Sequence, residues 1–486
     1  MLSLDSENDA WLQEHMQNGD LPNLAALAAS GVTLPVATGP LAGVPYPTMY
    51  SGLRPADLGF YFPLQWHAEQ QRLVSWLDLP MPETIFQRVD RSAKRIVVLD
   101  PPESHPVRLQ HGFAASGVQF RSRVLLHTWT SDQPRWANMM NRLGASHRAD
   151  EVFGEPSVAE LRRLRTALLT APARLAKAAL KILKQEPPDC LWLTFCGLHV
   201  AAHQFYRLPL VQDPEERRLL EGTRLDIAKG YDRLIGSLVE ALPPGSRIFA
   251  GYAKGMANLS YWADLLPAML RRILGQRNAN QPVNLLRRFI PRNFRRWAAQ
   301  SISDNRALQM MVRLSSPTAD WSRTRAFCLP TDFPGLIRFN VQGRERFGIV
   351  KEREIRELRE EIAEGLSTFD SIAGTPCVQT LKTPAELYGT GRFIDRFPDL
   401  IVTWKHETTA PTKAVRSAKF GTIQGTADVV GRSGNHAPGA FGILAGVPAN
   451  QVDRGGAIEI EDFVPTLLAG LGLPSGNLPG RPLWKN

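Results

Sequence analysis

Two histidines, His199 and His203, stand four residues apart just after the apolar run 191–195. In a helix this spacing places both imidazoles on one face, as two ligands of a single metal ion require. A third histidine, His436, stands in the glycine-rich turn 431–439. Three convergent imidazoles would form a zinc-type site with one open coordination position. The spacing of the pair alone is weak evidence for a metal, because two of the ten histidines will often share a helix face.

Each of these histidines stands close to an apolar segment for which the sequence predicts a strand. In an open α/β sheet, ligands bind beyond the carboxyl ends of the strands, so polar residues that follow apolar runs are candidates for a site. His199 and His203 fit this rule, and so does Asp5, which follows Met1–Leu4. Asp5 is therefore a further candidate site residue.

The elements that would position these residues alternate between short apolar runs and helical patterns, which predicts an α/β fold. Core strands are expected at Ile96–Leu99, Cys190–Phe195, Ile248–Gly251 and Leu400–Trp404. Helices are expected at Leu21–Ser30, from Ser157 to the proline at 172, at Ala173–Lys184 and at Glu352–Leu366. Ser157 with Glu160 forms the pattern of a capping box.

Four segments carry a resemblance to a known family. They are Gly19-Asp-Leu-Pro-Asn-Leu-Ala-Ala-Leu27, Pro47-Thr-Met-Tyr-Ser-Gly-Leu-Arg-Pro-Ala56, Glu461-Asp-Phe-Val-Pro-Thr-Leu-Leu468 and Gly480-Arg-Pro-Leu483. Together they resemble the alkaline phosphatase superfamily, close to its type I phosphodiesterase and nucleotide pyrophosphatase branch. The resemblance implies a three-layer α/β sandwich with a central, mostly parallel sheet. The core is expected at 1–256 and 349–486, with an irregular basic cap inserted at 257–348.

The resemblance also implies a ligand set. The family holds one metal ion with an Asp-x-x-x-His pair and a late histidine, and these positions match His199, His203 and His436, with histidine in place of the usual aspartate. Three histidines remain a sound set for zinc. For the second metal ion Asp5 matches a ligand, but the family's consecutive Asp-His reads Ala253-Lys254. An ammonium cannot ligate a cation, although Lys254 could supply a fixed positive charge in its place.

The nucleophile implied by the resemblance is a serine or threonine. Its position, nine residues before Ser51, is occupied by Ala42, which cannot attack phosphorus. Thr48 and Thr38 lie near but out of register, so either would be a displaced nucleophile. The alternative for Thr48 is a helix-start hydroxyl packed behind the site.

Two hypotheses of different class follow. In the first, the chain is a metal-dependent hydrolase or transferase acting on a phosphodiester, pyrophosphate or related anionic group, with one zinc on the three histidines and Lys254 steadying the anion. In the second, it is an inactive pseudo-phosphodiesterase that binds a phosphorylated ligand or a protein partner. The convergent histidines favour the first hypothesis, and the alanine at the nucleophile position favours the second.

Composition limits the alternatives. No apolar run approaches the roughly 18 residues that span a bilayer. The first residues lack a basic leader segment, and the four cysteines form no C-x-x-C pair, so we expect a reduced, cytoplasmic protein. The net charge of +10 includes an acid-free stretch between Met269 and Trp297. We expect a solvated cap surface there and not a nucleic-acid interface, because no nucleic-acid motif or aromatic platform accompanies its arginines: Arg271, Arg272, Arg277, Arg287, Arg288, Arg292, Arg295 and Arg296.

Overall fold

The computed structural model describes residues 1–41, 43–122, 127–144, 147–148, 156–208, 211–258, 262–276, 302–317, 319–331, 333–405, 414–425 and 432–485. The chain divides into two compact units. The first comprises Met1–Arg54, Met81–Leu259 and Asp428–Asn486, and the second comprises Pro55–Pro80 and Ser260–Ala427. The second unit thus starts close to the expected cap, but it extends about 80 residues beyond position 348 and takes in an early segment as well.

A nine-stranded sheet forms the centre of the first unit. Five of its eight strand pairings are parallel, and β22 and β9 run antiparallel to their neighbours. The strand order is β23 (Ile458–Glu459), β3 (Val32–Ala37), β22 (Phe441–Ala445), β12 (Ile248–Gly251), β1 (Leu2–Ser3), β11 (Cys190–Thr194), β6 (Ile96–Leu99), β7 (Phe113–Ser116) and β9 (Trp129–Thr130). The inner strands are buried on both faces, which explains why they read as continuous apolar runs in the sequence.

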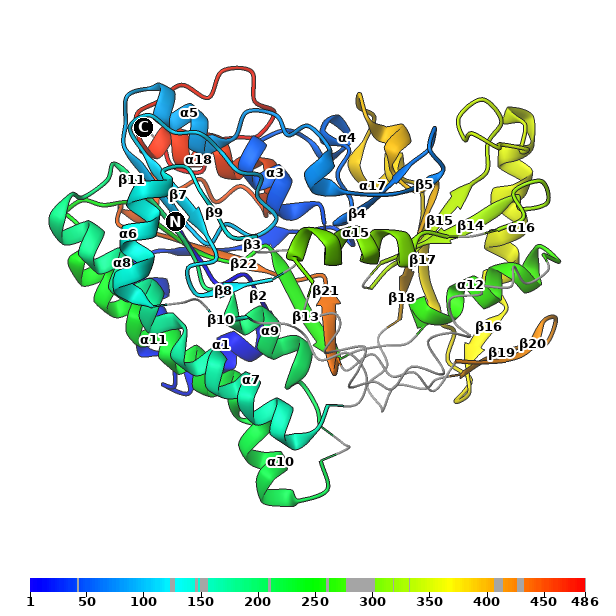
Figure 1. The fold of residues 1–486 in the computed structure, drawn as a ribbon, viewed down its shortest axis with the longest axis horizontal. Helices are drawn as coiled ribbons and strands as arrows, with labels where there is room; N and C mark the ends of the chain where they lie inside the picture. Colours follow the sequence, from blue (N-terminus) through cyan, green and yellow to red (C-terminus); the bar gives the residue numbers. More distant parts are fainter. Residues whose placement is uncertain are drawn as a thin grey trace. The chain divides into compact units, whose positions relative to one another are not determined.

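Helices cover both faces of this sheet, so the first unit has three layers (Figure 1). One layer contains α7 (Val158–Thr170), α8 (Pro172–Gln185) and α11 (Thr223–Ala241), and the opposite layer contains α3 (Pro45–Ser51), α5 (Ile85–Arg91) and α18 (Phe463–Gly470). The α/β class and the three-layer arrangement expected from the sequence are therefore confirmed.

Local sequence signals account for the limits of the first helical layer. The Ser157 hydroxyl accepts the Glu160 backbone N–H, and the Glu160 carboxylate accepts the Ser157 backbone N–H, which is the predicted capping box at the start of α7. Pro172 occupies the first turn of α8, where its missing N–H costs nothing. The apolar stripe of α7 is buried, and the helix packs against α8 and α11. The predicted helix 21–30 is also present, as α2 (Pro22–Ser30).

The second unit has its own sheet and core. Its four strands follow the order β14 (Ala326–Leu329), β15 (Gly335–Phe339), β18 (Leu400–Trp404) and β17 (Val378–Lys382), and they pack with α12 (Trp262–Ile273) and α16 (Ile355–Ser367). The run 400–404 is a strand as predicted, but the prediction that it belongs to the core sheet was wrong. It pairs with antiparallel neighbours in this smaller sheet, and an apolar run does not reveal which sheet it joins.

Within the described ranges, none of the helices combines the length and the apolar character that crossing a bilayer demands. Of the arginines in the acid-free stretch, Arg271 and Arg272 lie on α12, and the Arg272 guanidinium donates to the Phe420 carbonyl oxygen. The remaining six, from 277 to 296, lie outside the described residues.

Candidate metal centre

The candidate residues gather at the carboxyl ends of four adjacent parallel strands, β12, β1, β11 and β6. Asp5 follows β1, His199 and His203 follow β11, and Lys254 follows β12. Glu103, which the sequence did not single out, follows β6. Side chains from distant parts of the chain therefore meet at one edge of the sheet, where ligands bind in open α/β folds.

His199 and His203 project from α9 (Gly197–Gln204), which begins directly after β11. The backbone N–H of Gly197 donates to the Tyr231 hydroxyl at 2.8 Å, which occupies one of the unpaired donors in the first turn. A Cβ at position 197 would lie 2.4 Å from that hydroxyl oxygen, so glycine is needed there. Both imidazoles are buried and lie on the same face, as the spacing of four predicted.

His436 comes from a second small sheet formed by β2 (Ser6–Glu7), β13 (Lys254–Asn258) and β21 (Gly434–Ala437). Its backbone lies opposite Met256 in the β13–β21 register. The start of β21 is fastened to the end of α9, because the Ser433 N–H donates to the His203 carbonyl oxygen at 2.6 Å. This contact brings the third histidine to the first two.

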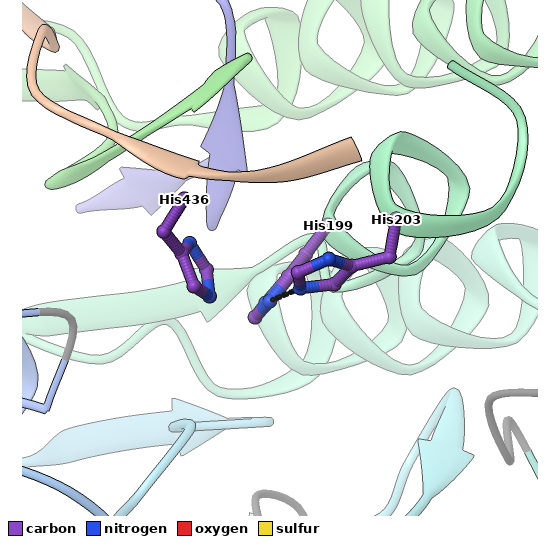
Figure 2. A group of neighbouring side chains, drawn as sticks. All are labelled: His199, His203 and His436. Carbon is purple, nitrogen blue, oxygen red and sulfur yellow. Dashed lines mark hydrogen bonds between the residues drawn. The ribbon is translucent and has the colours of Figure 1, made fainter. Parts of the chain in front are cut away.

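The three imidazoles converge on one point, as Figure 2 shows. One ring nitrogen from each of His199, His203 and His436 lies within 4.8 Å of the other two. The ring centroids are 4.9 to 5.0 Å apart. Zinc–nitrogen bonds of about 2.0–2.1 Å in a tetrahedron separate the ligand atoms by about 3.3 Å. To hold zinc, the Nε2 atoms of His199 and His203 would therefore open slightly from 3.0 Å, and the wider separations within the group, up to 4.8 Å, would close.

The hydrogen bonds fix which nitrogens face the centre. His199 Nδ1 lies 2.9 Å from the Asp5 carboxylate, and His203 Nδ1 lies 2.9 Å from the Gly434 carbonyl oxygen. Both partners can only accept, so both Nδ1 atoms carry the proton. In the neutral rings the two Nε2 atoms then present lone pairs to each other at 3.0 Å. Two facing lone pairs repel unless a metal ion or a proton lies between them, so the geometry fits a metal ion.

The pKa values of His203 and His436 agree with neutral rings. Burial, with a further contribution from the positive charge of Arg432, holds the pKa of His203 well below its usual range. Burial also lowers the pKa of His436, and the charges of His199 and Lys254 act in the same direction. The Nδ1 atom of His436 is buried and finds no hydrogen-bond partner among the described residues. Neutral imidazoles are the form that binds metal ions.

Asp5 binds His199 on the side of the ring that faces away from the other two histidines. One carboxylate oxygen accepts from His199 Nδ1, and the other accepts from the Tyr46 hydroxyl. Burial alone would raise the pKa of Asp5, but the charge and hydrogen bond of His199, together with the charge of Lys254 and the hydrogen bond of Tyr46, outweigh it and lower the pKa. The sequence suggested Asp5 as a metal ligand. In the structure it lies outside the convergent group and orients one of its members, as second partners of metal-bound histidines do.

Lys254 forms a buried ion pair with Glu103. The ammonium lies 2.5 Å from Glu103 Oε1 and 4.6 Å from the centroid of the Tyr46 ring. Both charged side chains are almost fully buried, with exposures of 3% and 5%. Glu103 lies 151 residues away along the chain, so no local pattern links it to Lys254. Its only signal in the sequence is its place after the predicted strand 96–99.

A pocket opens beside the histidines. It is lined by Thr38, Gly39, Pro40, Leu41, Pro45, Ala253, Lys254, His436 and Ala437. Its polar side chains are a hydroxyl, an ammonium and an imidazole, set among apolar walls. Thr48 does not line this pocket. Its hydroxyl is buried in α3 and has no hydrogen-bond partner in the described ranges. Position 42, expected for the nucleophile, lies outside the described residues.

The fold is of the alkaline-phosphatase type, as the sequence resemblance predicted. Among solved structures, the chain is similar to phosphonoacetate hydrolase from Sinorhizobium meliloti 1021, with a TM-score of 0.55, 12% identity, and coverage of 97% of this chain and 94% of the hydrolase. It is also similar to a variant of the alkaline phosphatase PafA, with a TM-score of 0.54, 11% identity, and coverage of 99% and 97%. Neither protein-family models nor curated proteins match this sequence.

Proposed function

We propose that the chain is a metal-dependent hydrolase of phosphoesters, with a single zinc ion held by His199, His203 and His436. The observation that carries this proposal is the pair of Nε2 atoms 3.0 Å apart, whose lone pairs face each other. A proton shared between the rings is the other way to relieve the repulsion. The depressed pKa of His203 disfavours a proton on that ring. A proton on His199 would be compensated by the Asp5 carboxylate at 2.9 Å, so the count of bound zinc decides between the two.

An oxygen of the phosphoryl group would enter the small pocket beside His436. When bound, a divalent ion supplies Lewis-acid stabilisation of a phosphoryl oxygen and activates a nucleophile. The protein residues hold the rings in place: Asp5 fixes His199 through Nδ1, and the Gly434 carbonyl fixes His203 in the same way. Small phosphorus-containing anions are a reasonable substrate class, since the hydrolase from Sinorhizobium meliloti was solved with phosphonoacetate.

Of the two threonines considered as displaced nucleophiles, Thr38 is the better placed. It lines the pocket with His436 and Lys254, whereas the Thr48 hydroxyl is buried within α3. Thr38 is therefore assigned the substrate contact, and Thr48 a packing role.

The test measures bound metal and hydrolysis in the same preparations. Zinc content is determined by elemental analysis, and p-nitrophenol release is followed from bis(p-nitrophenyl) phosphate, for the wild type, His203→Ala and the exposed control His111→Ala. We expect about one zinc per chain in the wild type and the control, and loss of both zinc and turnover in His203→Ala.

Two other outcomes would contradict the proposal in different ways. A wild type without bound metal, after incubation with zinc and dialysis, would exclude the metal centre. One bound zinc without turnover on phosphodiester and phosphomonoester substrates would instead support the pseudoenzyme, which binds a phosphorylated ligand and leaves it intact.

A further inference from the structure

The ion pair of Lys254 and Glu103 lies in the part of the site that the three histidines do not occupy. Asp5 and Glu103 bring two carboxylates to this side, and Tyr46 contacts both Asp5 and the Lys254 ammonium. Buried carboxylates need a compensating cation. The Lys254 ammonium meets this need through its bond to Glu103 and its position over the Tyr46 ring, where the π face adds to the attraction.

We propose that Lys254, held in place by Glu103, is a resident cation that takes the place of a second metal ion and binds phosphoryl oxygens in the pocket. This inference rests on the proposed function, because it assigns the charge that would assist the single zinc ion. Lys254 would contact substrate, whereas Glu103 is a positioning residue that acts through Lys254.

The pocket supports the contact with substrate. Lys254 lines it together with His436 and Thr38, although the side chain is only 3% exposed. An ammonium has three protons to donate. In the described part of the chain, Glu103 accepts one of them, and the pocket side remains for an anion. A buried cation attracts an oxyanion more strongly than an exposed one, because water screens it less.

The backbone around Glu103 indicates that its position is fixed. Glu103 and Asp100 both adopt left-handed conformations, with φ of 49° and 56°. Such conformations are costly for residues other than glycine and persist only where the surroundings impose them. The loop is also held by the Tyr50 hydroxyl, which donates to the Pro102 carbonyl oxygen at 2.8 Å. The ammonium therefore meets a carboxylate that has little freedom to move.

The same cluster disfavours a second divalent ion. Lysine has no lone pair to offer while it is protonated, and its charge repels a cation brought within a few ångströms. Glu103 is already engaged by the ammonium, and Asp5 is engaged by His199 and Tyr46. The inference therefore predicts one zinc per chain even when zinc is in excess.

The experiment uses inorganic phosphate as the probe, with binding measured by calorimetry on the zinc-loaded full chain and zinc counted in the same samples. The main variant is the double substitution Lys254→Met and Glu103→Gln, which avoids leaving a buried carboxylate unpaired. The matched control is Lys229→Met with Asp20→Asn, which removes a partly exposed ion pair of the same unit. Glu103→Gln alone keeps the ammonium but removes its anchor.

We expect the main variant to keep one zinc and to bind phosphate about 10- to 100-fold more weakly, the loss typical of one charged hydrogen bond. Glu103→Gln should show a smaller loss, and the control none. Unchanged phosphate affinity in the main variant with one zinc bound, or two zinc ions in the wild type, would overturn this inference alone. A wild type without zinc would refute the proposed function, and phosphate binding to the metal-free chains would still report on Lys254.

Discussion

The substitution Asp5→Asn separates a metal ligand from a residue that orients a ligand. Asp5 has a φ of 62°, a left-handed conformation that asparagine tolerates far better than alanine. The amide oxygen of asparagine can still accept from His199 Nδ1, and the amide nitrogen can donate to the Tyr46 hydroxyl oxygen. The substitution therefore keeps the shape of the network and removes its negative charge.

The expected effect follows from the bond that is weakened. Loss of a hydrogen-bonded carboxylate behind a metal-bound histidine typically costs 10- to 100-fold in metal affinity, or about 1.4 to 2.8 kcal/mol. We expect Asp5→Asn to weaken zinc binding within this range while one zinc per chain still binds at saturation. Tyr46→Phe removes one hydrogen bond to Asp5 and leaves its charge, so its effect should be smaller.

Competition with a chromophoric chelator measures the zinc affinity, and thermal unfolding of the metal-free proteins shows whether each variant folds. Loss of stoichiometric zinc binding from a folded Asp5→Asn variant would mean that Asp5 is itself a ligand, as the sequence suggested. Unchanged affinity would mean that the bond between Asp5 and His199 does not tune the site. Either result would refute the assigned role.

Three further substitutions test the packing of β21 beside the site and two local features of the fold. Gly434→Ala should lower both the thermal midpoint and the zinc affinity, because a Cβ there would lie 2.2 Å from the Ala202 carbonyl oxygen and force β21 away from α9. Gly230→Ala, in the middle of α11 with open space around it, should instead stabilise the fold by about 0.4–1 kcal/mol in urea unfolding and leave zinc binding unchanged. Ser157→Ala should cost about 1 kcal/mol in the same assay, since it removes the cap of α7; no loss would show that this cap is dispensable.

The secondary structure near the site could be predicted from the sequence because it depends on local patterns of residues. The strands 96–99 and 248–251 were predicted with the observed limits, and the capping box of α7 appears as expected. The run 400–404 shows where this kind of reasoning stops. An apolar run gives a strand, but sheet membership depends on contacts with residues far away in the chain.

In the candidate site, too, local sequence patterns indicated some residues, and only the folded chain reveals the others. The spacing of His199 and His203 placed both rings on one helix face, and the glycine-rich turn pointed to His436. The sequence could not assign a role to Asp5, because a carboxylate at the end of a strand can bind a metal ion or a histidine equally well. Glu103 was missed, since its partner Lys254 is 151 residues away and only the folded chain brings them together.

This chain departs at several positions from the ligand pattern that the sequence resemblance implies. The charge changes at these positions balance one another. Histidine at 199 and alanine at 253 each replace a carboxylate of that pattern, so the site lacks two negative charges. A single divalent ion in place of two removes two positive charges. The added Lys254 is paired with Glu103, and this pair is neutral. The net charge offered to an anion is therefore preserved although the ligands differ. This balance favours the proposed phosphoester hydrolase with one metal ion, whereas the alanine at position 42 favours the inactive alternative, so turnover by a zinc-loaded wild type decides between them.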